Sequence, residues 1–320
     1  MLLTYSNFCY NKIKGDMGMK IICIGNAAYD VTLPMNHFPI ENKKVRLEQS
    51  RIECGGGSAS NCAYLLAKWG VETYFAGIVG DDYYGNKIEE EFKEIGVNTK
   101  YLEKKAGIRT TSSFIITNTS IGSRTILSDK SKETVMSKRE VDDKFDVILL
   151  DGYEKDFAKE VIKKNPKAIK IIDAGSLREN TVELAHMMDY IVCSKDFAEE
   201  YTGLKIDYND MKTLIEIYDE LKKEFSQKIV ITLEDKGCFT YDNGYKMVPS
   251  IKVESLDSTG AGDIYHGAFT YCIANDYDII TTMKMSNIAG ALSVTRIGGR
   301  FSIFTLEEVK KKYDELTLSQ

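Results

Sequence analysis

The chain has 320 residues, 43% of them hydrophobic and 28% charged, with 24 glycines and 4 prolines. This composition excludes a disordered, collagen-like or low-complexity chain and is typical of one large α/β domain or two modest domains. The net charge is −6 and no basic block accompanies an aromatic stripe, so we expect no nucleic-acid partner. No apolar run reaches the length of a membrane span, so we expect no membrane partner.

The N-terminal residues 1–18 show no clear period, and we interpret them as an extension ahead of the domain. They have neither the basic start nor the long apolar stretch of an export signal, so we expect a cytoplasmic protein. The seven cysteines are scattered without CxxC spacing, which is typical of reduced thiols. Three histidines leave little from which to build a histidine metal site or a catalytic triad.

Strand and helix patterns alternate from Lys20 onward. Helices are predicted at residues 58–70 and 83–96, and buried strands at residues 20–25, 71–80, 146–151, 168–173, 189–194 and 228–233. This alternation of strands and helices predicts an α/β three-layer sandwich, with a mostly parallel central sheet and helices on both faces.

Two stretches interrupt the alternation of strands and helices. Residues 42–54 and 111–128 alternate polar and apolar side chains, and the second stretch predicts a hairpin that turns at residues 119–122. We therefore predict one domain over residues 19–320, with a small β-sheet lid inserted at residues 31–54 and 109–128.

The most specific motif is Asp-Ser-Thr-Gly-Ala-Gly-Asp at residues 257–263. It lies between a strand predicted to end near Val253 and a helix predicted over residues 264–275. Its glycines allow a tight turn that brings unpaired N–H groups to a helix N-terminus, where anions bind. The carboxylate of Asp263 could accept a proton while those N–H groups stabilise a moving phosphoryl group. A glycine-rich turn with an acidic first-turn residue is the structural alternative.

This motif resembles the signature of the ribokinase-like (PfkB) carbohydrate kinases, and the resemblance extends over about residues 20–304. It implies transfer of the γ-phosphate of ATP to a sugar hydroxyl, with Asp263 as the catalytic base and Gly260, Ala261 and Gly262 as the anion hole. ATP and Mg²⁺ are the implied cofactors.

The resemblance also extends to a monovalent cation beside the anion hole. Asp257 and Thr259 match positions in the loop that holds K⁺ in many members, although carbonyl ligands leave no side-chain signature.

The N-terminal half carries a second signature. Gly56 and Gly57, with Asn61 four residues after Gly57, are similar to the sugar-contacting GGxxxN pattern of the family. Asp30, five residues after Gly25, can accept hydrogen bonds from sugar hydroxyls. Taken alone, an aspartate after a strand is a turn former and a glycine run before a helix is a hinge; together with residues 257–263 they favour a sugar site.

The nucleotide segments match the family less closely. Residues 232–237 resemble its TLGxxG segment, so Thr232 and Gly237 are predicted to border ATP, but Glu234 replaces the first glycine. Ser194 begins the segment where many members have NxxE, and both the asparagine and the glutamate are missing, which leaves the magnesium ligands open. By analogy, Asn287 lines the adenine pocket.

The lid carries basic residues that could reach a substrate. Arg124, with Lys43 or Lys44, could bind an anionic group at the far end of the substrate, and solvated lid charges are the alternative. His266 lies one turn after Asp263, where a packed helix histidine is the favoured interpretation.

The substrate class is predicted from further resemblances. Residues 194–200, 122–127 and 298–300 look like those of ketose kinases, ketohexokinase and sulfofructose kinase in particular, which implies phosphorylation of the 1-hydroxyl of a ketose. A nucleoside kinase of the same fold is an alternative that Phe38 and Phe114 keep open, and a non-catalytic sugar sensor is another, disfavoured by the intact Asp263. An uncovered lid edge predicts a homodimer.

Overall fold

A twisted central sheet organises the molecule in the computed structural model, which describes residues 18–47, 49–130 and 135–318. Its strand order is β13-β12-β11-β10-β9-β8-β1-β4-β5. The strands are β1 (Lys20–Ile24), β4 (Glu72–Gly80), β5 (Asn98–Lys105), β8 (Val147–Leu150), β9 (Ile169–Ala174), β10 (Tyr190–Ser194), β11 (Lys228–Thr232), β12 (Cys238–Tyr241) and β13 (Tyr245–Val248). All neighbours from β11 to β5 pair in parallel, whereas β12 and β13 add an antiparallel edge.

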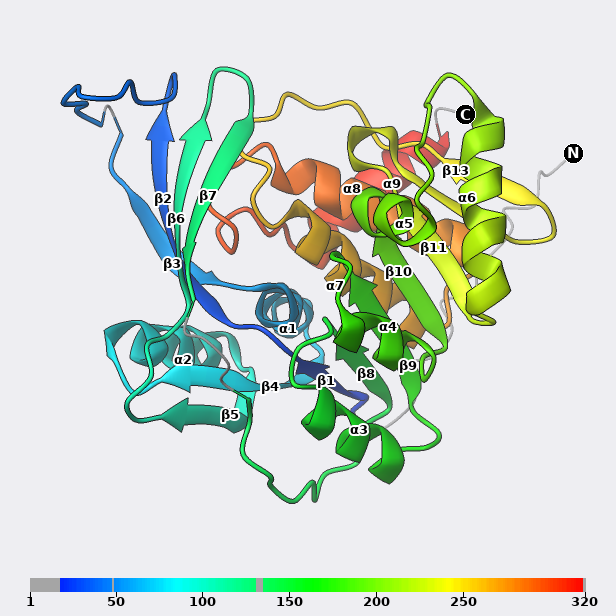
Figure 1. The fold of residues 1–320 in the computed structure, drawn as a ribbon, viewed down its shortest axis with the longest axis horizontal. Coiled ribbons are helices and arrows are strands. Elements are labelled where there is room, and N and C mark those ends of the chain that lie inside the picture. The colour runs from blue at the N-terminus through cyan, green and yellow to red at the C-terminus, as the bar shows by residue number, and fades with distance from the viewer. Residues whose placement is uncertain (1–17, 48, 131–134, 319–320) are drawn as a thin grey trace, which may run out of the picture.

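Helices cover both faces of this sheet (Figure 1). One face carries α1 (Ser58–Lys68), α2 (Tyr83–Ile95), α7 (Ala261–Ala274), α8 (Ile279–Ser293) and α9 (Leu306–Leu318). The other carries α3 (Lys155–Lys164), α4 (Glu179–Ala185), α5 (Lys195–Thr202) and α6 (Met211–Glu224). In β1, Ile21 and Cys23 pack into the first core while Ile22 and Ile24 pack into the second, as alternation in a strand buried on both faces requires. The predicted three-layer sandwich is confirmed.

A second sheet of four strands stands beside the central one (Figure 1). Its order is β3-β2-β6-β7, from β2 (Ala28–Met35), β3 (Ile52–Gly56), β6 (Ser112–Asn118) and β7 (Ser123–Asp129). We call it the lid. The predicted hairpin is present as β6 and β7, joined by residues 119–122.

The register of the lid decides which side chains share a face. Asp30 is opposite Ser113, Val31 is opposite Phe114, and Thr117 is opposite Arg124. Because successive side chains alternate between faces, Asp30 and Arg124 share one face and Phe114 lies on the other.

Two expectations about the strands were wrong, and two strands at the sheet edge were missed. Of the predicted stretch 42–54, residues 52–54 belong to β3, whereas residues 42–47 and 49–51 form no strand. β3 pairs with β2, which begins only three residues after Gly25. No strand ends near Val253: β13 ends at Val248 and is followed by Pro249, which lacks the N–H that would continue a ladder. β12 and β13 were not predicted: their sequences, CFTY and YKMV, mix polar and apolar residues and lack the apolar run that marks the buried strands.

Other expectations concern parts of the chain beyond the sheets. Most of the predicted N-terminal extension, residues 1–17, lies outside the described residues. Within the described ranges, no helix is both long and apolar enough to cross a membrane. Six cysteines fall in those ranges, and each is a free thiol buried in the protein.

Candidate active site

The N-terminus of α7 lies where residues 257–263 turn into the helix. Gly260 caps the helix with φ 75°, a left-handed conformation that favours glycine. Among the described residues, no group accepts a hydrogen bond from the N–H groups of Gly262 and Asp263, and Gly262 is exposed. Free N–H groups at a helix N-terminus bind anions. The turn can therefore receive phosphoryl oxygens.

Asp263 is held from the other half of the chain. Asn61 on α1 donates from Nδ2 to Asp263 Oδ2 at 2.7 Å, and the Cys62 thiol donates to the Asp263 carbonyl at 3.2 Å. Loss of solvent around the half-buried carboxylate raises the pKa of Asp263, whereas the Asn61 bond and the charge of Arg124 oppose this rise. A carboxylate with a raised pKa is a better proton acceptor, as a general base requires.

Asp30 lies close to this carboxylate, on β2 of the lid. It is 6% exposed, and burial raises its pKa to about 6, a rise that the Ser113 hydrogen bond opposes and the negative charge of Asp263 increases. A β-carbon on Gly56 would lie 2.1 Å from Asp30 Oδ2, so only glycine fits beside this side chain. The structure thus brings Asp30, Gly56 and Asp263 together.

The start of α1 completes this group. Gly57 has φ 92°, and a β-carbon there would lie 2.6 Å from the Asn26 carbonyl oxygen. Asn61 is 2% exposed, and its Oδ1 has no hydrogen-bond partner among the described residues. An unpaired buried acceptor destabilises the ligand-free protein and can be satisfied by a ligand hydroxyl.

Arg124 lies at a different end of the site from the one we expected. Its guanidinium reaches from β7 to donate to Ser258 Oγ in the loop before α7. Its charge also lowers the pKa of Asp263, against the larger effect of burial. Arg124 therefore faces the loop at residues 257–263, whereas Lys43 and Lys44 are exposed on the loop that links β2 and β3.

Asp257 and Thr259 brace the same loop. Asp257 Oδ1 accepts from the Thr259 N–H at 2.9 Å and from its hydroxyl at 2.6 Å, while Oδ2 accepts from the Gly298 N–H at 2.9 Å. Both carboxylate oxygens already have partners, so the side chain of Asp257 acts here as a structural acceptor. Its assignment to a monovalent cation stays a prediction.

Two predicted nucleotide residues are occupied by local hydrogen bonds. Ser194 caps α5: its hydroxyl accepts from the Phe197 N–H at 3.0 Å and donates to the Gly175 carbonyl at 3.1 Å. The Asn287 amide donates to the carbonyls of Val248 and Pro249 at 3.0 and 3.2 Å. Both side chains therefore support the protein around a nucleotide site more than they offer free groups to it.

The segment after β11 retains the shape of a glycine turn. Glu234 has φ 53°, so it adopts the left-handed conformation that the expected glycine would adopt freely. Gly237 has φ 109°, and a β-carbon there would lie 2.1 Å from the Val248 carbonyl oxygen. Thr232 ends β11 and donates to the Cys193 carbonyl at 3.3 Å.

Two buried acids at this edge of the sheet were missed from sequence. Asp151 follows β8 and accepts from the N–H groups of Asn26 and Ala59 at 2.7 and 3.1 Å. Asp173 is in β9, and burial raises its pKa to about 6. In the sequence, each of these acids stands at the end of an apolar run that predicts a strand. Only the strand order shows that the two acids lie close together.

His266 is a packed helix residue, as favoured from sequence. Its Nδ1 lies 2.6 Å from the Gly262 carbonyl and its Nε2 lies 3.1 Å from the Val192 carbonyl and 3.4 Å from Asp173 Oδ1. The ring is therefore tied to the backbone beneath the anion hole.

The described part of the chain offers no cluster of side chains suited to hold magnesium. Ser194 and Phe197 stand where the family has asparagine and glutamate, and the described residues contain no group of three or more acids, histidines or cysteines that could hold a metal. The residues present do not fit a protein-held Mg²⁺ site.

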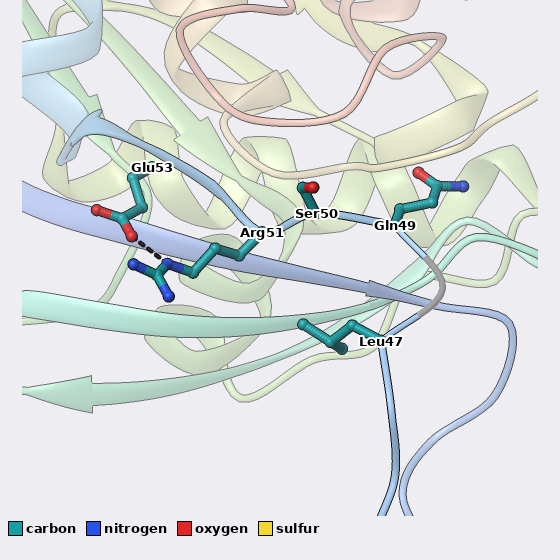
Figure 2. A pocket seen from close by; sticks show the side chains of 5 residues that line it. All are labelled: Leu47, Gln49, Ser50, Arg51 and Glu53. Atoms are coloured by element: carbon teal, nitrogen blue, oxygen red, sulfur yellow. Dashed lines mark hydrogen bonds and ion pairs between the residues drawn. The ribbon is translucent and has the colours of Figure 1, made fainter.

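Cavities do not by themselves locate the site. An open groove of about 690 Å³ lies before and along β3 and is lined by Leu47, Gln49, Ser50, Arg51 and Glu53, with an Arg51–Glu53 ion pair (Figure 2). None of these five was predicted as a site residue. A smaller cavity of about 50 Å³ touches Gly25 and Asn26 at the end of β1.

Comparison with known proteins agrees with this geometry. Residues 19–306 match the pfkB family carbohydrate kinase profile. The chain is similar to a ribokinase from Bacillus subtilis (28% identity over 92% of this chain and 99% of that protein) and to a deoxyribokinase from Salmonella typhi (26% identity over 91% and 97%). Its fold is similar to that of a ribokinase from Arabidopsis thaliana solved with ribose and ATP (TM-score 0.76, 20% identity, 92% of this chain and 98% of that one).

Proposed function

This chain belongs to the pfkB family of carbohydrate kinases, and on that premise we propose that it transfers the γ-phosphate of ATP to a hydroxyl of a small sugar, with Asp263 as the base. The family acts on alcohol groups of sugars or nucleosides, so the chain is a phosphotransferase. The observation that carries the proposal is the Asp263 carboxylate, with its raised pKa, beside the free N–H groups of Gly262 and Asp263.

The acceptor is proposed to bind between the lid and α1. Asp30 and the unpaired Oδ1 of Asn61 would accept hydrogen bonds from its hydroxyls, and Gly56 and Gly57 let it approach the backbone. The reacting hydroxyl oxygen then bonds to the γ-phosphorus, the bond from that phosphorus to the bridging oxygen of ADP breaks, and the hydroxyl proton passes to Asp263.

The N-terminus of α7 is proposed to hold the transferring group. The N–H groups of Gly260, Ala261 and Gly262 would bind its oxygens, with the Ala261 N–H giving up its 3.4 Å bond to the Ser258 carbonyl, and Arg124 faces them from the lid. Thr232, Gly237, Ser194 and Asn287 border the proposed nucleotide site.

ATP and its metal are proposed as cofactors. The Arabidopsis relative with this fold was solved with ATP, which supports ATP as the donor. Mg²⁺ accompanies nucleotide phosphates and keeps several waters, so phosphates and water would hold most of it here. K⁺ beside Asp257 and Thr259 is the weaker part of the proposal.

The finer proposal is the 1-hydroxyl of a ketose, supported by the resemblances at residues 122–127, 194–200 and 298–300. An aldopentose is the second candidate, supported by the names of the Bacillus and Salmonella relatives. A nucleoside is disfavoured, because Phe114 lies on the lid face opposite Asp30 and could not stack on a base there.

One experiment tests the reaction and ranks the acceptors. ADP release is measured with D-fructose, D-ribose, 2-deoxy-D-ribose, fructose 6-phosphate and adenosine, each with and without K⁺. We expect turnover with a sugar, fastest with D-fructose, and stimulation by K⁺. ADP release with adenosine alone would replace the sugar proposal, and release that no acceptor stimulates would refute it.

We also propose a homodimer that works in the cytoplasm. The outer face and edge of the lid expose Phe114 (39%) and Leu127 (55%), and β7 forms an unpaired edge of the four described lid strands. A second copy of the chain would cover both. Leu127→Asp should shift the mass in light scattering from dimer to monomer; a wild-type monomer contradicts this proposal.

A further inference from the structure

Arg300 is a buried cation outside the groups assigned above. It is 2% exposed and follows Gly298 and Gly299 in the loop between α8 and α9. Its Nη1 donates to Glu91 Oε2 at 2.7 Å and its Nη2 donates to Ser60 Oγ at 2.5 Å. A charge this deeply buried persists only when it is paired, so its partners indicate what it holds in place.

Those partners hold the junction between β3 and α1: Ser60 is in the first turn of α1, and Glu91 contacts the junction from α2. Both Glu91 oxygens accept from the Gly55 N–H, at 3.1 and 3.0 Å. A β-carbon on Gly55 would lie 2.2 Å from Arg300 Nη1, so the guanidinium lies directly against the backbone of β3. Gly56 and Gly57 of the proposed sugar site follow at once.

The same loop contacts the phosphate end. The Gly298 N–H donates to Asp257 Oδ2 at 2.9 Å. A β-carbon on Gly260 would lie 3.6 Å from Gly299 Cα, and one on Gly299 would lie 3.8 Å from Asn61 Nδ2. Residues 298–300 therefore touch the anion-hole loop, the sugar-binding helix and the lid strand in turn.

We propose that Arg300 and Glu91 are positioning residues that fix the β3–α1 junction against the anion-hole loop, so that the acceptor hydroxyl and the phosphoryl group meet in one geometry. This inference rests on the proposed kinase function. Ser60 and Glu91 belong to different helices, so a forked guanidinium can hold both where a single ammonium cannot. Burial raises the pKa of Asp30, and the charge of Arg300 opposes that rise, so Arg300 also acts on the proposed sugar site.

Arg300→Lys tests the pair, with Arg296→Lys as the matched control. Arg296 is in the same loop but is exposed, and its Nη2 lies 3.6 Å from Glu308 Oε1. For Arg300→Lys we expect the KM for D-fructose or D-ribose, whichever the wild type phosphorylates, to rise about tenfold and kcat to fall by a similar factor, with the KM for ATP within about twofold. The control should match the wild type. A wild-type sugar KM in Arg300→Lys overturns the proposal.

A double variant separates positioning from stability. Arg300→Met with Glu91→Gln removes both charges and keeps an acceptor for the Gly55 N–H. Replacing a whole buried ion pair is often neutral for stability. We therefore expect a Tm near that of the wild type with a sugar KM that stays raised; recovery of the wild-type sugar KM would show that the pair only stabilises the fold.

Hydrogen exchange on the ligand-free protein provides a measurement independent of turnover. In Arg300→Lys the amides of residues 55–60 should exchange about tenfold faster than in the wild type, while those of α6 are unchanged. Unchanged exchange at residues 55–60, or uniform acceleration along the chain, overturns the proposal. If the wild type phosphorylates no acceptor, the kinase proposal fails while this measurement still decides whether the pair fixes the junction.

Discussion

The proposed acceptor end and the proposed nucleotide end of the site differ in how they are built. At the acceptor end, Asn61 holds Asp263 through a bond between residues 202 positions apart. At the nucleotide end, Ser194 caps its own helix and the Asn287 amide binds the main chain. The acceptor end is thus arranged before a ligand arrives, whereas the nucleotide end offers mainly backbone.

This difference indicates where precision matters to the proposed reaction. A base must lie within hydrogen-bond reach of the proton that it accepts, and a small misplacement slows the reaction greatly. A triphosphate is long, charged and accompanied by its own metal, so it tolerates a site built from backbone groups. Substitutions at the acceptor end should therefore have the larger effects.

The largest expected effect is that of Asp263→Asn. The amide keeps the size of the side chain and its contact with Asn61 but cannot accept the proton, so kcat should fall about 10³-fold or more while sugar and ATP still bind. Single-turnover rates and calorimetric titrations measure the two quantities. A single-turnover rate close to that of the wild type would remove Asp263 from its role as the base.

Asp30→Ala should mainly weaken sugar binding. Loss of charged hydrogen bonds should raise the KM for the sugar about 100-fold and leave the KM for ATP within about twofold. Initial rates with each substrate varied in turn give both values. An unchanged KM for the sugar would separate Asp30 from the acceptor site.

The pH dependence tests both acids together. Burial raises the pKa of Asp30 from 3.8 to about 6 and raises that of Asp263. Each acid must be ionised to accept a hydrogen bond or a proton, so kcat/KM for the sugar should fall by about tenfold per unit as the pH drops below about 6, and more steeply once the second acid is protonated too. A rate that stays level down to pH 4.5 would contradict these environments.

The raised pKa of Asp30 has the opposite consequence for stability. The folded protein binds this proton more tightly than the unfolded chain, so the stabilisation is complete below 3.8 and is lost as the pH rises through about 6. Asp30→Asn should therefore increase the free energy of unfolding at pH 8 by about 3 kcal/mol, and this difference should shrink towards pH 4. Urea unfolding at the two pH values measures it.

Arg124→Met should distinguish the two ends of the substrate. Because Arg124 faces the loop before α7, we expect kcat to fall about tenfold and the KM for the sugar to change little. Lys43→Met, on the exposed lid loop, is the control and should match the wild type. A raised sugar KM with unchanged kcat would indicate instead that Arg124 binds the far end of the substrate, as the sequence predicted.

The smallest effect is expected at the nucleotide end. Glu234→Gly removes the backbone strain of a left-handed residue but increases the backbone entropy of the unfolded chain, so the free energy of unfolding should rise by only about 0.5 kcal/mol. The KM for ATP should stay within about twofold. Gly237→Ala, at φ 109° and against the Val248 carbonyl, should instead destabilise the protein by about 2 kcal/mol. Equal effects of the two changes would contradict the conformations described.

The parallel strands β1, β4, β8, β9, β10 and β11 were predictable from sequence because each is a largely apolar run, whereas β5, with the sequence NTKYLEKK, was not predicted. Residues 228–233 were predicted and Lys228–Thr232 is β11; residues 58–70 were predicted as a helix and Ser58–Lys68 is α1. β2 was not predicted separately, because it begins three residues after the turn at Gly25, where φ is 152°, and its sequence, AYDVTLPM, contains Asp30 and Pro34 and is not a plain apolar run.

The placement of Arg124 could not be predicted, because it depends on pairing between segments distant in sequence. β6 pairs with β2 and with β7, and only this register turns Arg124 toward the face of Asp30. The same limit applies to Asp151 and Asp173, since the strand order β9-β8-β1 brings their strands side by side. Local motifs specified the loop at residues 257–263, and tertiary pairing specified what surrounds it.

The rates at which a reagent modifies the buried thiols report how often different parts of the structure open. Cys54 is in the lid strand β3, whereas Cys193 and Cys272 lie in the hydrophobic cores on the two faces of the central sheet. A thiol reagent can modify such side chains only while the surrounding structure is transiently parted. The labelling rate at Cys54 would therefore measure the local opening of the lid. The labelling rates at the two core thiols would measure the rarer unfolding of the whole chain.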